Sequence, residues 1–214
     1  MPNETFSDEA ALFLIGHPDT LVPAVRCIEV SATRRSQGHL ALSFRRCGDL
    51  SRLLIPLTAS AERTDGLWQR TCFEAFVAVP GEKSYLEFNF SPSGQWAAYA
   101  FSDYRQRDQG ADPLGCPHVR VERGKDRDYD SLTLKALLSD DDLPKGIGTG
   151  TLQLGLSAVV EYVESVDGHA SRLSYWALRH PGGKPTPKPD FHQRDTFSLE
   201  LPSTKETLIN GHFE

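Results

Sequence analysis

Alternation of apolar and polar residues with a period of two runs through most of this chain, and it limits the fold more than any other feature. Residues 84–90, SYLEFNF, place Leu86, Phe88 and Phe90 on one side of an extended backbone. The longest such pattern covers residues 151–163. The same alternation predicts further strands at residues 25–32, 39–44, 72–79, 95–102, 172–180 and 196–202.

Turn residues separate these segments, and SPSG at residues 91–94 joins two of them as a hairpin. Residues 118–124 and 131–137 are weaker strands, and the leucines at 134, 137 and 138 leave a short helix open there. No alternation of strands with helices and no linker is visible. The sequence therefore predicts one all-β domain over residues 1–214, a jelly-roll-like antiparallel β-sandwich of roughly ten strands with at most one or two short helices. Residues 203–214 are expected to be a frayed tail.

The overall charge argues against a nucleic-acid partner. The formal net charge is -6, whereas nucleic-acid binding needs a basic surface. Acidic residues Glu4, Asp8 and Glu9 occupy the N-terminal region, and the apolar run at 10–15 is too short for a secretory signal or a membrane span. We therefore expect a cytoplasmic protein with no membrane partner.

Common cofactor and catalytic motifs are absent from the sequence. It has no phosphate-binding loop, GxSxG or HExxH motif, and GIGTG at 146–150 precedes a predicted strand, so it is interpreted as a turn. Haem held by His and Met is not expected, because Met1 is the one methionine. No cofactor is predicted from these patterns.

All three tryptophans lie beside polar residues in the predicted strands. Trp68 precedes Glu74 by six residues, so both share a sheet face if the strand already includes Trp68. Trp96 returns across a hairpin from Asn89, and Trp176 belongs to the strand at 172–180. An aromatic plane covers the apolar face of a sugar, while carboxylates and amides bind its hydroxyls. The alternative, that each tryptophan is a core residue, stays open.

The stretch SYWALRHPGGKPTPKPDFHQRD, residues 174–195, contains His180, Asp190 and His192. These side chains could bind a metal ion, act as an acid–base pair, or fix the loop by hydrogen bonds to its backbone. The spacing of twelve residues between the two histidines is not that of a closed zinc site. We favour the loop-fixing role over metal binding, and metal binding over catalysis.

Several long strings resemble a known group of proteins. LWQRTCFEAFV, YLEFNFSPSGQWAAYAFSDYR, YWALRHPGGKP and PDFHQRDTFSL resemble bacterial DOMON-like proteins related to carbohydrate-binding module family nine, from about Leu67 to Leu201. The resemblance implies an antiparallel β-sandwich in which Trp68 and Trp176 enclose a sugar and Glu74 matches a polar position. It also implies that structural calcium is possible. Haem-binding DOMON proteins use a Met and a His, and this chain has no internal Met.

These observations together predict a non-catalytic protein that binds a small molecule, most simply a sugar or glycoconjugate. One alternative is an enzyme, such as a metal-assisted hydrolase, built on His180, Asp190 and His192. Another is a module that binds a protein partner through the same aromatic face. The predicted ligand-binding residues are Trp68, Glu74, Asn89, Trp96, Arg105, Trp176, His180, Asp190 and His192.

Overall fold

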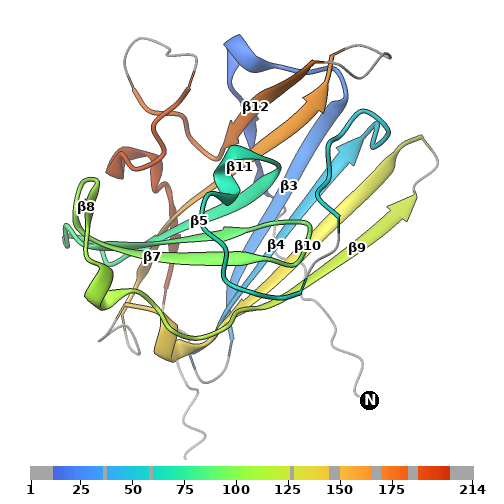
Figure 1. Ribbon diagram of the computed structural model, residues 1–214. Coiled ribbons are helices and arrows are strands. Elements are labelled where there is room, and N and C mark those ends of the chain that lie inside the picture. Colours follow the sequence, from blue (N-terminus) through green and yellow to red (C-terminus); the bar gives the residue numbers. More distant parts are fainter. Residues whose placement is uncertain are drawn as a thin grey trace, which may run out of the picture.

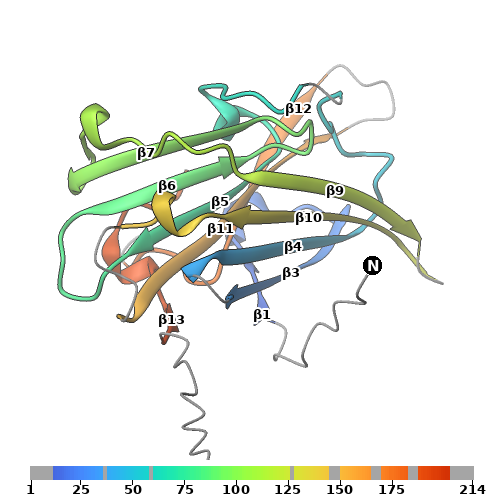
Figure 2. The ribbon, with the colours of Figure 1, turned by 90° about the horizontal axis from the view of Figure 1, so that it is seen from below.

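The computed structural model describes residues 12–35, 38–57, 60–125, 128–144, 150–164, 170–182 and 188–202. The predicted tail at 203–214 and residues 146–149 of the predicted GIGTG turn lie outside them. The described strands form two antiparallel sheets (Figures 1 and 2). Within these ranges, helix is confined to single 3₁₀ turns, among them η1 (Pro18–Thr20), η3 (Leu67–Gln69), η4 (Gln109–Ala111), η5 (Asp140–Asp142) and η7 (Arg194–Thr196). The prediction of an all-β antiparallel sandwich is confirmed.

The smaller sheet has five strands in the order β1-β3-β4-β10-β9. Their bounds are Leu12–Phe13 (β1), Val25–Arg34 (β3), Leu40–Gly48 (β4), His118–Lys125 (β9) and Asp130–Leu138 (β10). The helix left open at 134–138 is therefore strand. Its leucines pair with β4 through Leu134 opposite Phe44 and Leu138 opposite Leu40, so the alternation dominates over the helical spacing.

The larger sheet has eight strands, in the order β2-β12-β11-β5-β6-β7-β8 with β13 paired to β11. Their bounds are Ile15–Gly16 (β2), Cys72–Ala78 (β5), Tyr85–Phe90 (β6), Trp96–Asp103 (β7), Gln106–Arg107 (β8), Leu152–Val163 (β11), Ser171–Ala177 (β12) and Leu199–Leu201 (β13). The strand predicted at 172–180 ends at residue 177, and the one predicted at 196–202 shrinks to three residues because η7 occupies 194–196.

The core lies between the two sheets and receives every second side chain from each. Phe44 of β4 packs on Phe73 of β5 with ring centroids 5.2 Å apart, which joins the layers. The larger sheet is buried on its other face as well, so β5 is buried along its whole length. We call this second side, turned away from the smaller sheet, the outer face. None of the described helices is long and apolar enough to cross a membrane.

Candidate functional site

A cavity of about 300 Å³ opens on the outer face of the larger sheet. Its floor comes from the strands, and its walls come from η3, the β7–β8 hairpin and the segment after β12. We call residues 188–197 of that last segment the covering segment; in Figure 1 it lies beside β8. The lining residues are Trp68, Glu74, Phe76, Glu87, Tyr99, Phe101, Arg105, Arg107, Val159, Tyr175, Lys188, Pro189, Phe191 and His192.

Trp68 enters the cavity from a tight turn rather than from a strand. Gly66 caps η3 with φ +79°, a left-handed conformation that glycine adopts without a Cβ clash. The indole of Trp68 then meets Tyr99 of β7 edge-to-face, with ring centroids 6.1 Å apart. The turn thus places an aromatic wall beside the sheet, on the same side as Glu74.

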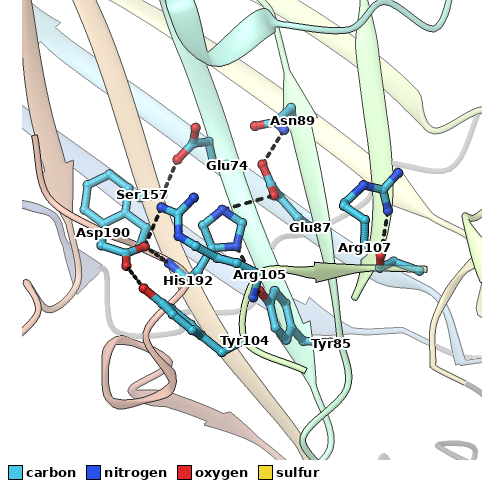
Figure 3. A network of polar contacts seen from close by, with 12 residues as sticks. Glu74, Tyr85, Glu87, Asn89, Tyr104, Arg105, Arg107, Ser157, Asp190 and His192 are labelled. Atoms are coloured by element: carbon cyan, nitrogen blue, oxygen red, sulfur yellow. Dashed lines mark hydrogen bonds and ion pairs between the residues drawn. The ribbon is translucent and has the colours of Figure 1, made fainter. Parts of the chain in front are cut away.

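Two carboxyl groups form part of the cavity floor. Glu74 of β5 is 4% exposed and accepts a hydrogen bond from the Ser157 hydroxyl at 2.8 Å, and Glu87 of β6 is 6% exposed and accepts one from the Asn89 amide at 2.7 Å (Figure 3). Burial raises the pKa of Glu74 to about 8, and the nearby Glu87 adds to the rise. Burial also raises the pKa of Glu87, against the effect of Asn89. Glu74 is therefore mainly a neutral acid at pH 7.

His192 lies over the outer face of these strands and is held by Tyr85. The Tyr85 hydroxyl lies 2.9 Å from His192 Nδ1 and accepts the backbone N–H of Arg105 at 3.2 Å. The other ring nitrogen, Nε2, lies 3.7 Å from the Glu87 carboxylate. Burial lowers the pKa of His192 to about 4, and Arg105 lowers it further while Asp190 opposes the shift. The ring is therefore neutral near pH 7.

The β7–β8 hairpin supplies one rim of the cavity through Arg105. This residue has φ +54°, the left-handed region that a side chain with a Cβ disfavours. Its guanidinium pairs with Asp190 at 2.7 Å, and the Tyr104 hydroxyl donates to the same carboxylate (Figure 3). The pair fastens the hairpin to the covering segment. Although burial opposes it, hydrogen bonds from Arg105 and Tyr104 lower the pKa of Asp190, which stays ionised.

Arg107 forms the neighbouring part of the rim and is held by Asp112. Two parallel hydrogen bonds of 2.8 and 2.9 Å join the guanidinium to the carboxylate. The guanidinium also lies over Tyr99, 4.8 Å from the ring centroid. Asp112 further accepts the backbone N–H of Ala100 and the Arg63 guanidinium, so it anchors the hairpin at two residues and joins it to Arg63.

The covering segment rests on the sheet through aromatic contacts. Phe197 packs on Phe76 with ring centroids 5.4 Å apart, and it fits because Gly155 has no side chain. A Cβ on Gly155 would lie 2.9 Å from the Phe197 ring. His192 packs on Phe76 and Phe101 at 5.3 and 5.0 Å. The cavity is thus closed on one side by a segment distant in sequence from its floor.

The structure brings together some of the residues that the sequence predicted. Trp68, Glu74, Arg105 and His192 line the cavity, and Asp190 holds Arg105 at its rim. Asn89 lies on the same outer face but is fully buried, where it supports Glu87.

The other three predicted residues lie elsewhere. Trp96 and Trp176 are 5% and 6% exposed and belong to the core between the sheets, because both point to the inner side of the larger sheet. The Trp176 indole donates to Ser174 there. His180 lies beyond the end of β12, where its Nε2 donates to the Ile15 carbonyl at 2.7 Å. The three tryptophans therefore do not converge.

Sequence reasoning missed several lining residues. Tyr99 and Phe101 belong to a strand whose other face holds Trp96, and Tyr175 alternates with Trp176. Because alternate residues of a strand point to opposite faces, assigning Trp96 and Trp176 to the core would have placed Tyr99, Phe101 and Tyr175 on the outer face. Arg107 carried no signal in the sequence.

The candidate metal-binding residues His180, Asp190 and His192 do not form a metal-binding cluster in the described structure. Within the described ranges, no group of three or more His, Cys, Asp and Glu side chains is arranged to hold a metal ion. The Nε2 atom of His180 is occupied by its hydrogen bond to the Ile15 carbonyl. The side chains of Asp190 and His192 instead fix the covering segment to the hairpin and to Tyr85.

No protein-family model and no curated protein sequence matches the chain. Among solved structures, the crystal structure of a "putative carbohydrate-binding protein" from Bacteroides uniformis is similar to it, with a TM-score of 0.56 and 16% sequence identity. The match covers 91% of this chain and 85% of that one. At this identity the likeness extends to the fold alone.

Proposed function

We propose that the cavity on the outer face binds a carbohydrate, as a non-catalytic recognition site. The observation that carries this proposal is the composition of the cavity, in which aromatic side chains flank two buried carboxyl groups. Sugars present apolar C–H faces and polar hydroxyls, and this lining matches both. The volume of about 300 Å³ suits a small ligand, since ligand pockets range from roughly 300 to 1,000 Å³.

Two further observations support the proposal. The similar structure from Bacteroides uniformis bears the name of a carbohydrate-binding protein. The resemblance to DOMON-like proteins and family-nine modules, which stays a prediction, implies the same class of ligand. In the present proposal Trp68 takes the stacking role, whereas Trp176 is left out because it lies in the core.

Calorimetric titration with a panel of mono- and disaccharides tests the proposal. We expect at least one sugar to bind, and Trp68→Ala to weaken it at least tenfold, or about 1.4 kcal/mol. Phe13→Ala is the matched control, because Phe13 is an aromatic side chain 55% exposed on the smaller sheet. Absence of binding across the panel, or equal affinity in the Trp68 and Phe13 variants, would contradict the proposal.

A further inference from the structure

The two carboxyl groups of the cavity floor lie on neighbouring strands and close to one another. Glu74 is directly opposite Asn89 in the β5–β6 pair, and Glu87 is two residues from Asn89 on β6. Diagonal neighbours of this kind have Cα atoms roughly 7–8 Å apart on one face of a sheet. A single group of a ligand can therefore contact both carboxyls.

Both carboxyls have hydrogen-bonding capacity that the described residues leave unused. A carboxylate offers about four acceptor sites. Glu74 accepts one hydrogen bond, from Ser157, and Glu87 accepts one from Asn89 with His192 Nε2 at 3.7 Å. Across the described residues, no lysine or arginine forms an ion pair with Glu74 or Glu87, although both lie within a cavity that arginines line.

The arginines at the rim already have acidic partners. Arg105 pairs with Asp190, and Arg107 pairs with Asp112 through two hydrogen bonds. Lys188 also lines the cavity and weakly opposes the rise in the pKa of Glu74. Within the described part of the chain, the negative charge that the floor can develop is therefore not matched by an ion pair, although Arg107 and Arg105 act on Glu87 at longer range.

Aromatic side chains surround the same floor. Tyr99 has one face covered by Arg107, and Trp68 and Tyr175 line the cavity around Glu74 and Glu87. The electron-rich faces of such rings attract cations, and this attraction adds to that of a carboxylate when water is excluded. Neutral hydroxyls would form hydrogen bonds with the carboxyls but would not be attracted by the aromatic faces as a cation is.

We propose that the sugar bound in this cavity carries a protonated amino group, and that its ammonium lies between Glu74 and Glu87. The inference rests on the proposed carbohydrate-binding function and names the ligand class of the same site. An ammonium donates up to three hydrogen bonds, which matches the free acceptor sites of the two carboxyls.

Binding of an ammonium has a proton signature. Glu74 holds its proton at pH 7 in the empty site, because burial raises its pKa to about 8. An ammonium beside it favours the ionised carboxylate, so binding releases a proton to the solvent. The titratable and charged groups that line the cavity with Glu74 or adjoin it are Cys72 on its own strand, Glu87 on β6, Tyr99 on β7, Tyr175 on β12, Arg105 and Arg107 on the hairpin, and Lys188 and His192 on the covering segment.

Titration calorimetry at pH 7 with three 2-amino-2-deoxyhexoses, their parent hexoses and their N-acetyl derivatives tests the inference. The probes are the gluco, galacto and manno isomers. We expect at least one amino sugar to bind tenfold or more tightly than its parent and N-acetyl forms. Repetition in buffers of different ionisation enthalpy should give release of close to one proton for the amino sugar and none for the neutral sugars.

Glu74→Gln is the decisive variant, because glutamine keeps the shape of the protonated side chain and cannot ionise. It should remove both the preference for the amine and the proton release, and Glu87→Gln should reduce the preference. Glu122→Gln, on the smaller sheet, is the matched control and should change neither. Circular dichroism checks that each variant is folded.

The outcomes separate this inference from the function on which it rests. Binding of neutral hexoses with equal or higher affinity than the amino sugars overturns the amine inference and leaves carbohydrate binding in place. Preference for the amino sugar that persists unchanged in Glu74→Gln overturns the assigned position of the ammonium. Absence of binding in all three series overturns both.

Discussion

Trp68 and Trp176 lie on opposite faces of the larger sheet. Trp68 borders the cavity on the outer face, whereas Trp176 is buried between the two sheets, where its indole donates to Ser174. The two residues therefore have separable roles, one at the proposed binding site and one in the core. Substitution of each by alanine should affect different properties.

Trp176→Ala should lower the free energy of unfolding by about 3–5 kcal/mol, because it leaves a large cavity in the core. Trp68→Ala should cost under about 2 kcal/mol, since Trp68 is only partly buried and borders an open cavity, so its removal leaves no enclosed void. Urea denaturation of both variants measures the difference. Equal destabilisation would contradict the assignment of the two tryptophans to different environments.

Glu74 should make the protein less stable as pH rises. Its carboxyl has a pKa of about 8 in the folded protein against an ordinary value of 4.5, so between pH 4.5 and 8 the unfolded chain binds fewer protons than the folded one. This stabilising contribution is complete below pH 4.5 and is lost as pH rises through 8. Because glutamine cannot ionise, Glu74→Gln lacks this loss. Between pH 5 and 8, the free energy of unfolding of the variant should therefore rise by about 3 kcal/mol relative to that of the wild type. Denaturant titrations of both proteins at pH 5, 6, 7 and 8 measure this gain, and a constant difference would refute it.

His192 should destabilise the protein in acid. Burial lowers the pKa of His192 from 6.5 to about 4, so the unfolded chain takes up a proton first as pH falls. The contribution of neutral His192 to the free energy of unfolding is fully present above pH 6.5. It is lost between pH 6.5 and 4, by about 2 kcal/mol after allowance for partial exposure. NMR titration of the histidine ring protons checks this, with the His192 signal assigned from the spectrum of His192→Gln. A midpoint near 6.5 for that signal would be inconsistent with the packing of the covering segment.

Asp112→Ala should destabilise the hairpin that carries the arginine rim. It removes the partner of Arg107, an ion pair to Arg63 and the acceptor of the Ala100 N–H. The Ala100 N–H loses its acceptor, whereas Arg107 and Arg63 keep hydrogen bonds to backbone carbonyls, so the free energy of unfolding should fall by about 2 kcal/mol. Asp108→Ala is the control, because Asp108 is an exposed acidic residue of the same loop. Denaturation midpoints of the two variants give the comparison, and similar values would count against the anchoring role.

Arg105 allows a test of backbone strain. Both Arg105→Gly and Arg105→Ala lose the ion pair with Asp190, but only glycine adopts φ near +54° without a Cβ clash. Arg105→Gly should therefore be more stable than Arg105→Ala by about 1 kcal/mol. Thermal melts of the pair measure this difference. Higher stability of the alanine variant would contradict the left-handed conformation at this position.

The strands were predictable because alternation and turn residues are local signals. The segments at residues 72–79, 84–90, 95–102 and 151–163 are strands within one or two residues of the expected bounds. The two-residue strands β1, β2 and β8 were not expected, since so short a run has no period to detect. The shortening of the strand predicted at 196–202 follows from η7 and the packing of Phe197, which are tertiary effects.

The site was predictable only in part, because the larger sheet is buried on both faces. On β12, Trp176 and Tyr175 are both buried, so apolar character cannot tell which of them faces the core. The assignment depends on which side the smaller sheet covers, and that is a property of the whole fold. Glu74 was predicted because it follows Trp68 by six residues and matches a polar position of the group that the sequence resembles.

The central strands of the larger sheet carry two sets of side chains, one that packs in the core and one that borders the cavity. On β5, Phe73, Ala75 and Val77 pack in the core, while Glu74 and Phe76 border the cavity. Substitutions at one set leave the other set's neighbours unchanged, because adjacent residues point to opposite sides. Ligand preference can therefore diverge among descendants of such a chain, or be redesigned in the laboratory, while the interior that keeps it folded stays the same.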